Sequence, residues 1–234
     1  MPARGGPVWA KYLARPNRFS LLVSLAGREE LVHLPNPGRL LEVLTPGREI
    51  LLRPAAPGRR KTRYTAVGAR LAGFIVSLDS TLPNRFFPVA LAAGLIPPLR
   101  GWRIIRREPP LGRGRADFLL GRGGEELVVE VKSITWVESG VALFPDAPTS
   151  RGRRHMEELA LLAGSGKRAA VLFVVQRPDA VRFGPSPVDP GFSAALARAL
   201  AAGVEAWALV CRFDGEELRG ERFLGREQLV LPQG

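Results

Sequence analysis

The stretch Glu126-Leu127-Val128-Val129-Glu130-Val131-Lys132-Ser133-Ile134 reads as a buried β-strand that carries charged side chains in an apolar setting. Because side chains alternate between the two faces of a strand, Glu130 and Lys132 share one face with Val128. The opposite face then takes Leu127, Val129 and Val131. The stretch therefore predicts a central strand with an acid and an ammonium group side by side.

A second strand is expected just before it, at residues 115–120. The connection, residues 121–124, contains three glycines and has the composition of a tight turn. If Leu120 pairs with Leu127, Asp117 falls opposite the glutamate of the central strand, with the two Cβ atoms about 5 Å apart. A register shifted by one residue would turn Asp117 to the other face. The proximity of the two acids depends on this register.

Two neighbouring carboxylates repel each other, and a divalent cation relieves that repulsion. Mg²⁺ or Mn²⁺ would take oxygen ligands from Asp117 and Glu130, the backbone carbonyl of Val131 and several waters. Such a metal acidifies a bound water and neutralises charge that builds on a phosphate. Lys132, on the same face, could position that water or stabilise the transition state. The pattern therefore predicts a metal-dependent catalytic site for phosphodiester cleavage.

Two alternatives remain open at this stage. The Asp, Glu and Lys side chains could form an ordinary ion-pair cluster on a solvated sheet face, because Glu-x-Lys alone is a common pattern. Gln176 ends a strand expected at Ala169–Gln176 and is a further candidate for the catalytic site. Its alternative role is that of a polar residue that simply closes the strand.

The order of expected elements indicates an α/β sandwich over residues 81–234. A helix at Phe86–Leu95, with Pro88 in its first turn, precedes three strands, and helices then alternate with strands. The expected strands are Trp102–Arg107, Arg115–Leu120, Glu126–Ile134, Ala169–Gln176 and Val204–Phe213, and the two later helices are Arg151–Ala163 and Pro190–Ala202.

The first 80 residues read instead as short strands separated by Gly- and Pro-rich turns. Five strands in a basic segment fit a small barrel of the oligonucleotide-binding (OB) type, and an SH3-like barrel would give a similar pattern. The sequence therefore predicts two domains, 1–80 and 81–234. The expected barrel strands are Phe19–Leu25, Glu30–Leu34, Glu49–Arg53, Arg63–Ala69 and Phe74–Leu78.

The net charge of +12 is concentrated in the first part of the chain. Residues 1–99 hold 14 basic and 5 acidic side chains, a net +9, whereas residues 100–234 hold 20 and 17, a net +3. A compact region with this charge attracts polyphosphate, which makes DNA the expected partner and RNA an alternative. A basic surface without a ligand would have the same composition.

The candidate nucleic-acid contacts are basic side chains in two places. One group lies in the expected barrel, and the other lies at the start of a helix, where free N–H groups and the helix dipole favour phosphate. A solvated basic helix end is the alternative for the second group. The candidates are Arg15, Arg18, Arg39, Arg59, Arg60, Lys61, Arg63, Arg151, Arg153, Arg154 and His155.

Several classes of protein are disfavoured. No apolar run is long enough to span a bilayer, and the N-terminal residues lack the apolar core of a signal peptide, so a cytoplasmic location with no membrane contact is expected. The single cysteine, Cys211, cannot form an internal disulfide. Two histidines, His33 and His155, make a histidine-rich zinc site improbable. The oligomeric state is not predicted.

Several short motifs occur over nearly the whole chain: Arg15-Pro16-Asn17-Arg18-Phe19, Leu34-Pro35-Asn36-Pro37-Gly38, Thr45-Pro46-Gly47, Pro83-Asn84-Arg85, Asp117-Phe118-Leu119-Leu120, Val129-Glu130-Val131-Lys132-Ser133, Phe144-Pro145-Asp146-Ala147 and Arg151-Gly152-Arg153-Arg154-His155. Together they resemble the motifs of the sugar fermentation stimulation protein A family. The resemblance implies a DNA-binding protein with an N-terminal OB barrel and a PD-(D/E)xK nuclease-like second domain, in a group linked to transcription regulation of sugar utilisation genes. Val89 stands where the family has a glutamate that often assists metal binding, and Pro37 replaces a threonine.

Overall fold

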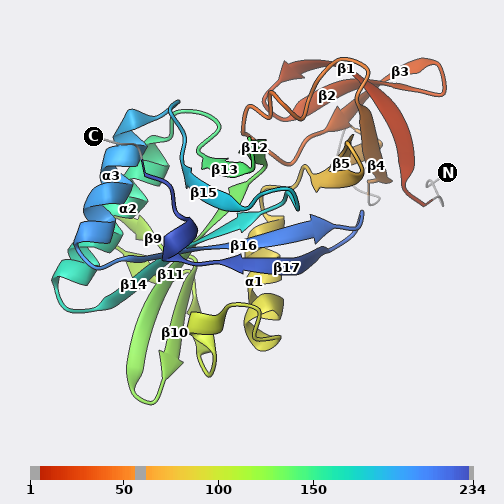
Figure 1. The fold of residues 1–234 in the computed structure, drawn as a ribbon. Helices are drawn as coiled ribbons and strands as arrows, with labels where there is room; N and C mark the ends of the chain where they lie inside the picture. The colour runs from red at the N-terminus through yellow and green to blue at the C-terminus, as the bar shows by residue number, and fades with distance from the viewer. Residues whose placement is uncertain (1–5, 56–61, 232–234) are drawn as a thin grey trace. The chain divides into compact units, whose positions relative to one another are not determined.

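A computed structural model of the chain describes residues 6–55 and 62–231. The chain divides into two compact units (Figure 1). The first comprises Met1–Leu82 with Arg212–Arg219, and the second comprises Pro83–Cys211 with Gly220–Gly234. The main division lies two residues from the boundary that the sequence predicts at residue 80, but the short segment 212–219 returns to the first unit.

The first unit contains a closed five-stranded barrel. Its ring runs β1–β2–β3–β5–β4 and back to β1, with antiparallel neighbours except for the parallel pair His33↔Thr65 between β3 and β5. The prediction of an OB-type barrel is confirmed. The strands are β1 (Val8–Asn17), β2 (Ser20–Leu25), β3 (Arg28–His33), β4 (Glu49–Pro54) and β5 (Tyr64–Leu71), and β6 (Phe74–Ser77) pairs with β5 outside the ring.

The sequence-based strand list was wrong in one respect. It omitted β1 and counted β6 as the fifth barrel strand. The pairing of β1 with β2 shifts register between Tyr12 and Ala14 and again before Asn17. These irregularities break the alternation of buried and exposed residues, so the strand has no clear period-two pattern.

The second unit is built on a mixed sheet in the order β7–β10–β11–β14–β16. Strands β7 (Arg103–Arg107), β10 (Phe118–Arg122) and β11 (Glu125–Ile134) are antiparallel, and β14 (Arg168–Val175) and β16 (Glu205–Phe213) continue parallel to β11. The sequence missed shorter elements, which are the strands β8 (Pro110–Leu111), β9 (Gly114–Arg115), β12 (Trp136–Glu138), β13 (Val141–Phe144), β15 (Arg182–Pro185) and β17 (Leu218–Leu224) and the 3₁₀ turns η1 (Pro97–Leu99) and η2 (Arg226–Gln228).

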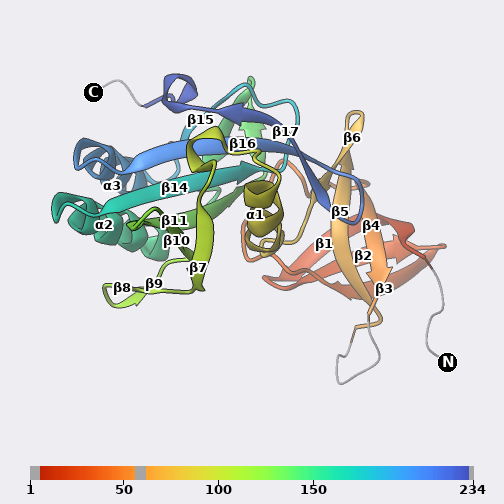
Figure 2. The same ribbon diagram turned by 90° about the horizontal axis from the view of Figure 1, so that it is seen from below.

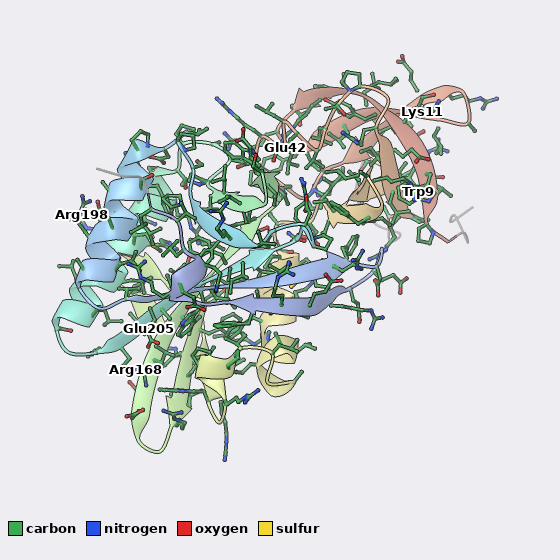
Figure 3. All side chains as sticks on the ribbon, viewed as in Figure 1. Trp9, Lys11, Glu42, Arg168, Arg198 and Glu205 are labelled. Carbon is green, nitrogen blue, oxygen red and sulfur yellow. The ribbon has the colours of Figure 1, made fainter. Side chains whose placement is uncertain are left out.

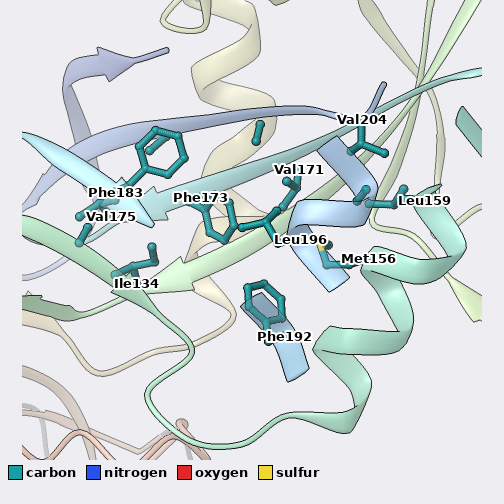
Figure 4. Packing of buried hydrophobic residues seen from close by; sticks show 14 of the residues in the cluster. Ile134, Met156, Leu159, Val171, Phe173, Val175, Phe183, Phe192, Leu196 and Val204 are labelled. Atoms are coloured by element: carbon teal, nitrogen blue, oxygen red, sulfur yellow. The ribbon is translucent and has the colours of Figure 1, made fainter. Parts of the chain in front are cut away.

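Helices α2 (Ser150–Gly164) and α3 (Pro190–Ala201) pack side by side on one face of this sheet (Figure 2). Met156 and Phe192, one from each helix, join Phe173 of β14 in a continuous apolar core (Figure 4). Helix α1 (Leu82–Ala92) contacts the other face, where the Phe87 and Phe118 rings lie 4.5 Å apart between centroids. The sheet is therefore covered on both sides, as the predicted α/β sandwich requires.

The capping residues show why α2 and α3 begin where they do. Thr149 accepts a hydrogen bond at its hydroxyl from the amide of Gly152 (3.0 Å), and Asp189 accepts one from the amide of Phe192 (2.9 Å). The other carboxylate oxygen of Asp189 accepts from the amide of Thr149 (2.8 Å). One buried acid therefore fixes the start of both helices.

Helix α1 differs from the sequence-based expectation. It spans Leu82–Ala92 instead of Phe86–Leu95, so Pro88 lies in its second turn and not in the first. A proline there cannot donate the backbone hydrogen bond back to residue 84. The earlier start brings Asn84 into the first helical turn, which matters for the site below.

Two charged residues form an ion pair where β14 and β16 begin. Arg168 at the start of β14 donates from Nη2 to Oε1 of Glu205 at the start of β16, at 2.8 Å (Figure 3). The guanidinium of Arg168 also lies 5.1 Å from the centre of the Trp102 ring. In the part of the chain that the structure describes, no helix has the length and apolar character needed to cross a bilayer.

Candidate active site

The predicted register between the two central strands is confirmed. Leu120 of β10 pairs with Leu127 of β11, and Phe118 pairs with Val129. Asp117 immediately precedes β10 and is therefore next in line beside Glu130. The register that brings the two acids together is the one on which the predicted site depends.

The Asp117 side chain is held by two hydrogen bonds. Its Oδ2 accepts from the backbone amide of Val131 at 2.7 Å, and its Oδ1 accepts from Nδ2 of Asn84 at 2.5 Å. Burial, followed by the negative charge of Glu130, raises the pKa of Asp117 to about 6, although these two hydrogen bonds and the positive charge of Lys132 act to lower it. The two carboxylates are therefore close enough to affect each other's ionisation.

Glu130 is buried, with 2% of its surface exposed. Its Oε1 accepts hydrogen bonds from Nζ of Lys132 at 2.5 Å and from Nδ1 of His155. Burial alone would raise the pKa of Glu130, but the hydrogen bonds and positive charge of His155 and Lys132 outweigh it and lower the pKa. Its second oxygen, Oε2, is buried and has no hydrogen-bond partner in residues 6–55 and 62–231.

These features exclude the alternative of a solvated ion-pair cluster. Only 3% of the Glu130 side chain and 11% of the Lys132 side chain are exposed. A surface ion pair leaves both carboxylate oxygens accessible to solvent, whereas Oε2 of Glu130 is buried and accepts no hydrogen bond from the described residues. The cluster is an interior site.

His155 has a different environment from the one expected for a phosphate contact. It lies in the first two turns of α2 and is 1% exposed, bonded to Glu130, so it does not present its ring at the surface. Met156 and Leu159 of the same helix are also buried. The i, i+4 relation of His155 to Leu159 places both on the core face, a periodicity that the sequence contains.

The arginines near His155 behave differently from it. Arg151 and Arg154 are exposed, and Arg154 forms a long contact with Glu158 (Nε–Oε1 3.7 Å). Arg153 is half-buried, and its Nε lies 3.5 Å from Oδ1 of Asp189. Arg151 and Arg154 are the two whose side chains remain available at the surface of this helix.

Gln176 is fully buried and is tied to Ser133. Its Nε2 donates to Oγ of Ser133 at 2.8 Å, and its backbone amide donates to the carbonyl of Ile134. Ser133 alternates to the face of β11 opposite Lys132. The side chain of Gln176 therefore contacts Ser133, which follows Lys132 in the chain, and not the two carboxylates. Its predicted catalytic role stays a prediction.

The candidate contacts in the barrel fall into distinct groups. Arg15 donates to four backbone carbonyls, those of Arg18, Asn36, Gly38 and Arg39, and so holds the loop after β3 in place. The side chains of Arg18 and Arg39 are exposed. Arg63 pairs with Glu30 (Nη2–Oε2 2.5 Å), and the candidates Arg59, Arg60 and Lys61 lie outside the described residues.

Asn84 is a site residue whose role the sequence did not indicate. It stands in the first turn of α1 and contacts Asp117 across 33 positions of sequence. Asn84 is a polar residue with no evident partner in its own segment, and this was the signal in the sequence that could have indicated its role. Val89, the position of the expected glutamate, is 60% exposed on the same helix.

The residues present fit a divalent cation of the Mg²⁺ type. Mg²⁺ is usually held by one or two carboxylates and keeps several waters, so it needs no dedicated cage of protein ligands. Within the described residues, no three His, Cys, Asp or Glu side chains come together as such a cage. Oε2 of Glu130 is buried and has no hydrogen-bond partner within the described residues, so it is the oxygen that a cation would satisfy.

Comparisons with known proteins agree with this architecture. Residues 13–78 match the family described as SfsA N-terminal OB domain, and residues 81–217 match the Sugar fermentation stimulation protein RE domain. The chain is 49% identical over 208 residues to a Sugar fermentation stimulation protein homolog of Moorella thermoacetica, covering 88% of this chain and 90% of that protein. A homolog of Methanothermobacter thermautotrophicus is 43% identical, with 85% and 83% covered.

A solved structure is similar over almost the entire chain. It is the Pyrococcus furiosus SfsA in complex with Ca²⁺, with 36% sequence identity and a TM-score of 0.87. The alignment covers 99% of this chain and 98% of that chain. The arrangement of a barrel followed by a nuclease-like α/β unit is therefore shared with an experimentally determined structure.

Proposed function

The chain belongs to the sugar fermentation stimulation protein family, and from that membership we propose that it binds DNA and hydrolyses phosphodiester bonds with a divalent cation held between Asp117 and Glu130. The observation that carries this proposal is the state of Glu130. Its Oε2 is buried and unbonded, while its charge raises the pKa of the neighbouring Asp117. A cation between the two carboxylates would remove both sources of unfavourable energy.

The proposed ligands are the two carboxylates and the backbone carbonyl of Val131. The Ca²⁺ complex of the Pyrococcus furiosus relative supports a divalent cation in this fold. Ca²⁺, Mg²⁺ and Mn²⁺ all accept carboxylate and carbonyl oxygens. When bound, the cation supplies an acidified water and neutralises charge on the phosphate.

The chain's own residues would perform the remaining tasks. Asn84 and the amide of Val131 orient the Asp117 carboxylate by holding one oxygen each. Lys132 places a positive charge on the same face as Glu130, where it can stabilise a phosphate oxygen or orient a water. Burial of the site strengthens these electrostatic effects because little water screens them.

DNA is the proposed polymer because the exposed basic side chains suit a phosphate backbone. Arg18 and Arg39 in the barrel unit, and Arg151 and Arg154 at the start of α2, are exposed and can each contact phosphate. Their contribution is electrostatic and does not depend on base sequence. RNA remains the alternative polymer, and competition between DNA and RNA at fixed salt concentration separates the two.

The test is cleavage of supercoiled plasmid and of branched DNA by the full chain in Mg²⁺ or Mn²⁺. We expect nicking that is abolished by EDTA and by Lys132→Ala. Lys167→Ala is the matched control, because Lys167 is exposed in the turn after α2 and should leave nicking unchanged. Tight DNA binding without cleavage over long incubation would instead identify a non-catalytic DNA-binding regulator that retains the nuclease fold.

A further inference from the structure

Two donors converge on one oxygen of Glu130. Nζ of Lys132 lies 2.5 Å from Oε1, and Nδ1 of His155 contacts the same atom. An ionised carboxylate can only accept, so Nδ1 must carry the proton and donate it to Glu130. Nζ and Nδ1 therefore lie 3.5 Å apart because both donate to the same oxygen, and they do not form a hydrogen bond with each other.

The position of Nζ bears on the task proposed for Lys132. Its ammonium group has three N–H donors and can serve Oε1 and a neighbouring water together, but a shift of Nζ toward a phosphate oxygen lengthens or breaks its bond to Oε1. If Lys132 were the sole donor, such a shift would leave a charged oxygen buried without a hydrogen bond, which is energetically unfavourable. A second donor on the same oxygen removes that obstacle.

We propose that His155 is a positioning residue that keeps Oε1 of Glu130 bonded when Lys132 turns to the substrate, and so presents Oε2 to the cation. This inference rests on the proposed function. His155 is suited to the role because it is 1% exposed and belongs to a helix fixed by its cap and core contacts. Groups that support metal ligands in this way orient the ligand and fix which atom faces the metal.

The two donors should therefore differ in their effects on cation binding and on cleavage. His155 should matter for cation binding, because it sets the orientation of a ligand. Lys132 should matter for cleavage and little for cation binding, because His155 still holds Oε1 when the lysine is absent. A purely structural role for His155 would not produce this separation.

The experiment measures Ca²⁺ binding to the full chain by isothermal titration calorimetry. His155→Phe keeps a ring but removes the donor, and we expect its Kd to rise about 10- to 100-fold. His155→Asn places an amide N–H near the position of Nδ1 and should stay within about threefold of the parent, as should Lys132→Met. Leu161→Ala is the control, since Leu161 is 76% exposed on the same helix.

The outcomes separate the inference from the function on which it rests. If the parent chain binds no divalent cation, the proposed function fails and the inference fails with it. If the parent binds Ca²⁺ and His155→Phe binds it equally well, only the inference is overturned. Equal losses in His155→Phe and Lys132→Met would also overturn it, because the two donors would then be equivalent.

A measurement on the unmodified protein covers the case in which His155→Phe fails to fold. The chain has two histidines, so nitrogen-15 NMR spectra resolve the ring of His155 from that of His33. We expect a hydrogen-bonded Nδ1–H on His155 both before and after Ca²⁺ is added. Loss of this proton on Ca²⁺ binding would contradict the proposal.

Discussion

Nδ2 of Asn84 lies 2.5 Å from Oδ1 of Asp117 and donates a hydrogen bond to it. This contact joins the first turn of α1 to the residue that enters β10. As a result, one carboxylate oxygen of Asp117 accepts a hydrogen bond from a side chain, and the other accepts one from the backbone amide of Val131. The carboxylate is therefore fixed in orientation before any cation arrives, which is what a pre-organised ligand requires.

Replacement of Asn84 by alanine should weaken both folding and cation binding. Oδ1 of Asp117 would lose its donor in a largely buried place, so we expect the free energy of unfolding to fall by about 1–3 kcal/mol. The pKa of Asp117 should rise further, because the Asn84 hydrogen bond lowers it. Urea denaturation and calorimetric Ca²⁺ titration measure the two effects. Val89→Ala, at an exposed position of the same helix, should change neither.

The stability of the cation-free protein should decrease as the pH rises through the range set by Asp117. Its pKa is about 6 in the folded chain and 3.8 for the free side chain, so the folded state binds the proton more tightly. The free energy of unfolding therefore decreases between about pH 4 and pH 7, by on the order of 3 kcal/mol. Glu130 acts in the opposite direction at lower pH, because its lowered pKa favours the folded state above about pH 4.5.

This pH dependence is checked by denaturation curves in EDTA at several pH values, for the parent chain and for Asp117→Asn. The asparagine variant should lack the decline between pH 4 and pH 7, because it has no proton to release. Addition of Ca²⁺ at pH 7 should restore stability to the parent and not to the variant. A parent chain whose stability is flat or rises over this range would contradict the burial and repulsion assigned to Asp117.

The central hairpin illustrates what the sequence could predict. The glycines at 123 and 124 have φ angles of +57° and +88°, values that suit a two-residue hairpin turn and that other residues rarely adopt. A tight turn leaves little freedom in register, and the alternation on β11 then places Glu130 and Lys132 on one face. The two acids could be brought together from sequence because both signals are local.

The environment of His155 and the contact of Asn84 could not be predicted in the same way. Each contact joins residues from elements that are distant in sequence, and the donor and acceptor meet only after a helix packs on the sheet. The strand β1 was missed for a related reason, because its irregular pairing with β2 removes the period-two signal. The local sequence pattern therefore predicted which charged residues lie together on the strands. The contacts that support them form only when distant elements pack together.

Arg15 should act as a structural residue of the barrel unit. Its guanidinium donates to four backbone carbonyls, three of which belong to Asn36, Gly38 and Arg39 in the loop after β3. Arg15→Ala would leave these carbonyls without their donor, so we expect a loss of about 1–3 kcal/mol in the free energy of unfolding. Arg18→Ala, at an exposed neighbour, should change stability by less than about 0.5 kcal/mol. Equal stability of the two variants would show that the Arg15 contacts are not formed in solution.

DNA affinity should fall steeply as salt concentration rises, because each phosphate that an arginine neutralises releases a counterion. The exposed side chains of Arg18 and Arg39 are the proposed contacts in the barrel unit, so the double variant Arg18→Ala/Arg39→Ala should reduce the slope of log K against log salt by about 2. Fluorescence anisotropy with duplex DNA at several salt concentrations gives this slope. Arg198→Ala is the control, because Arg198 is exposed on α3 (Figure 3) and pairs with Glu157 (Nη2–Oε1 3.4 Å). A slope that is the same in the double variant and the parent would remove these two arginines from the DNA interface.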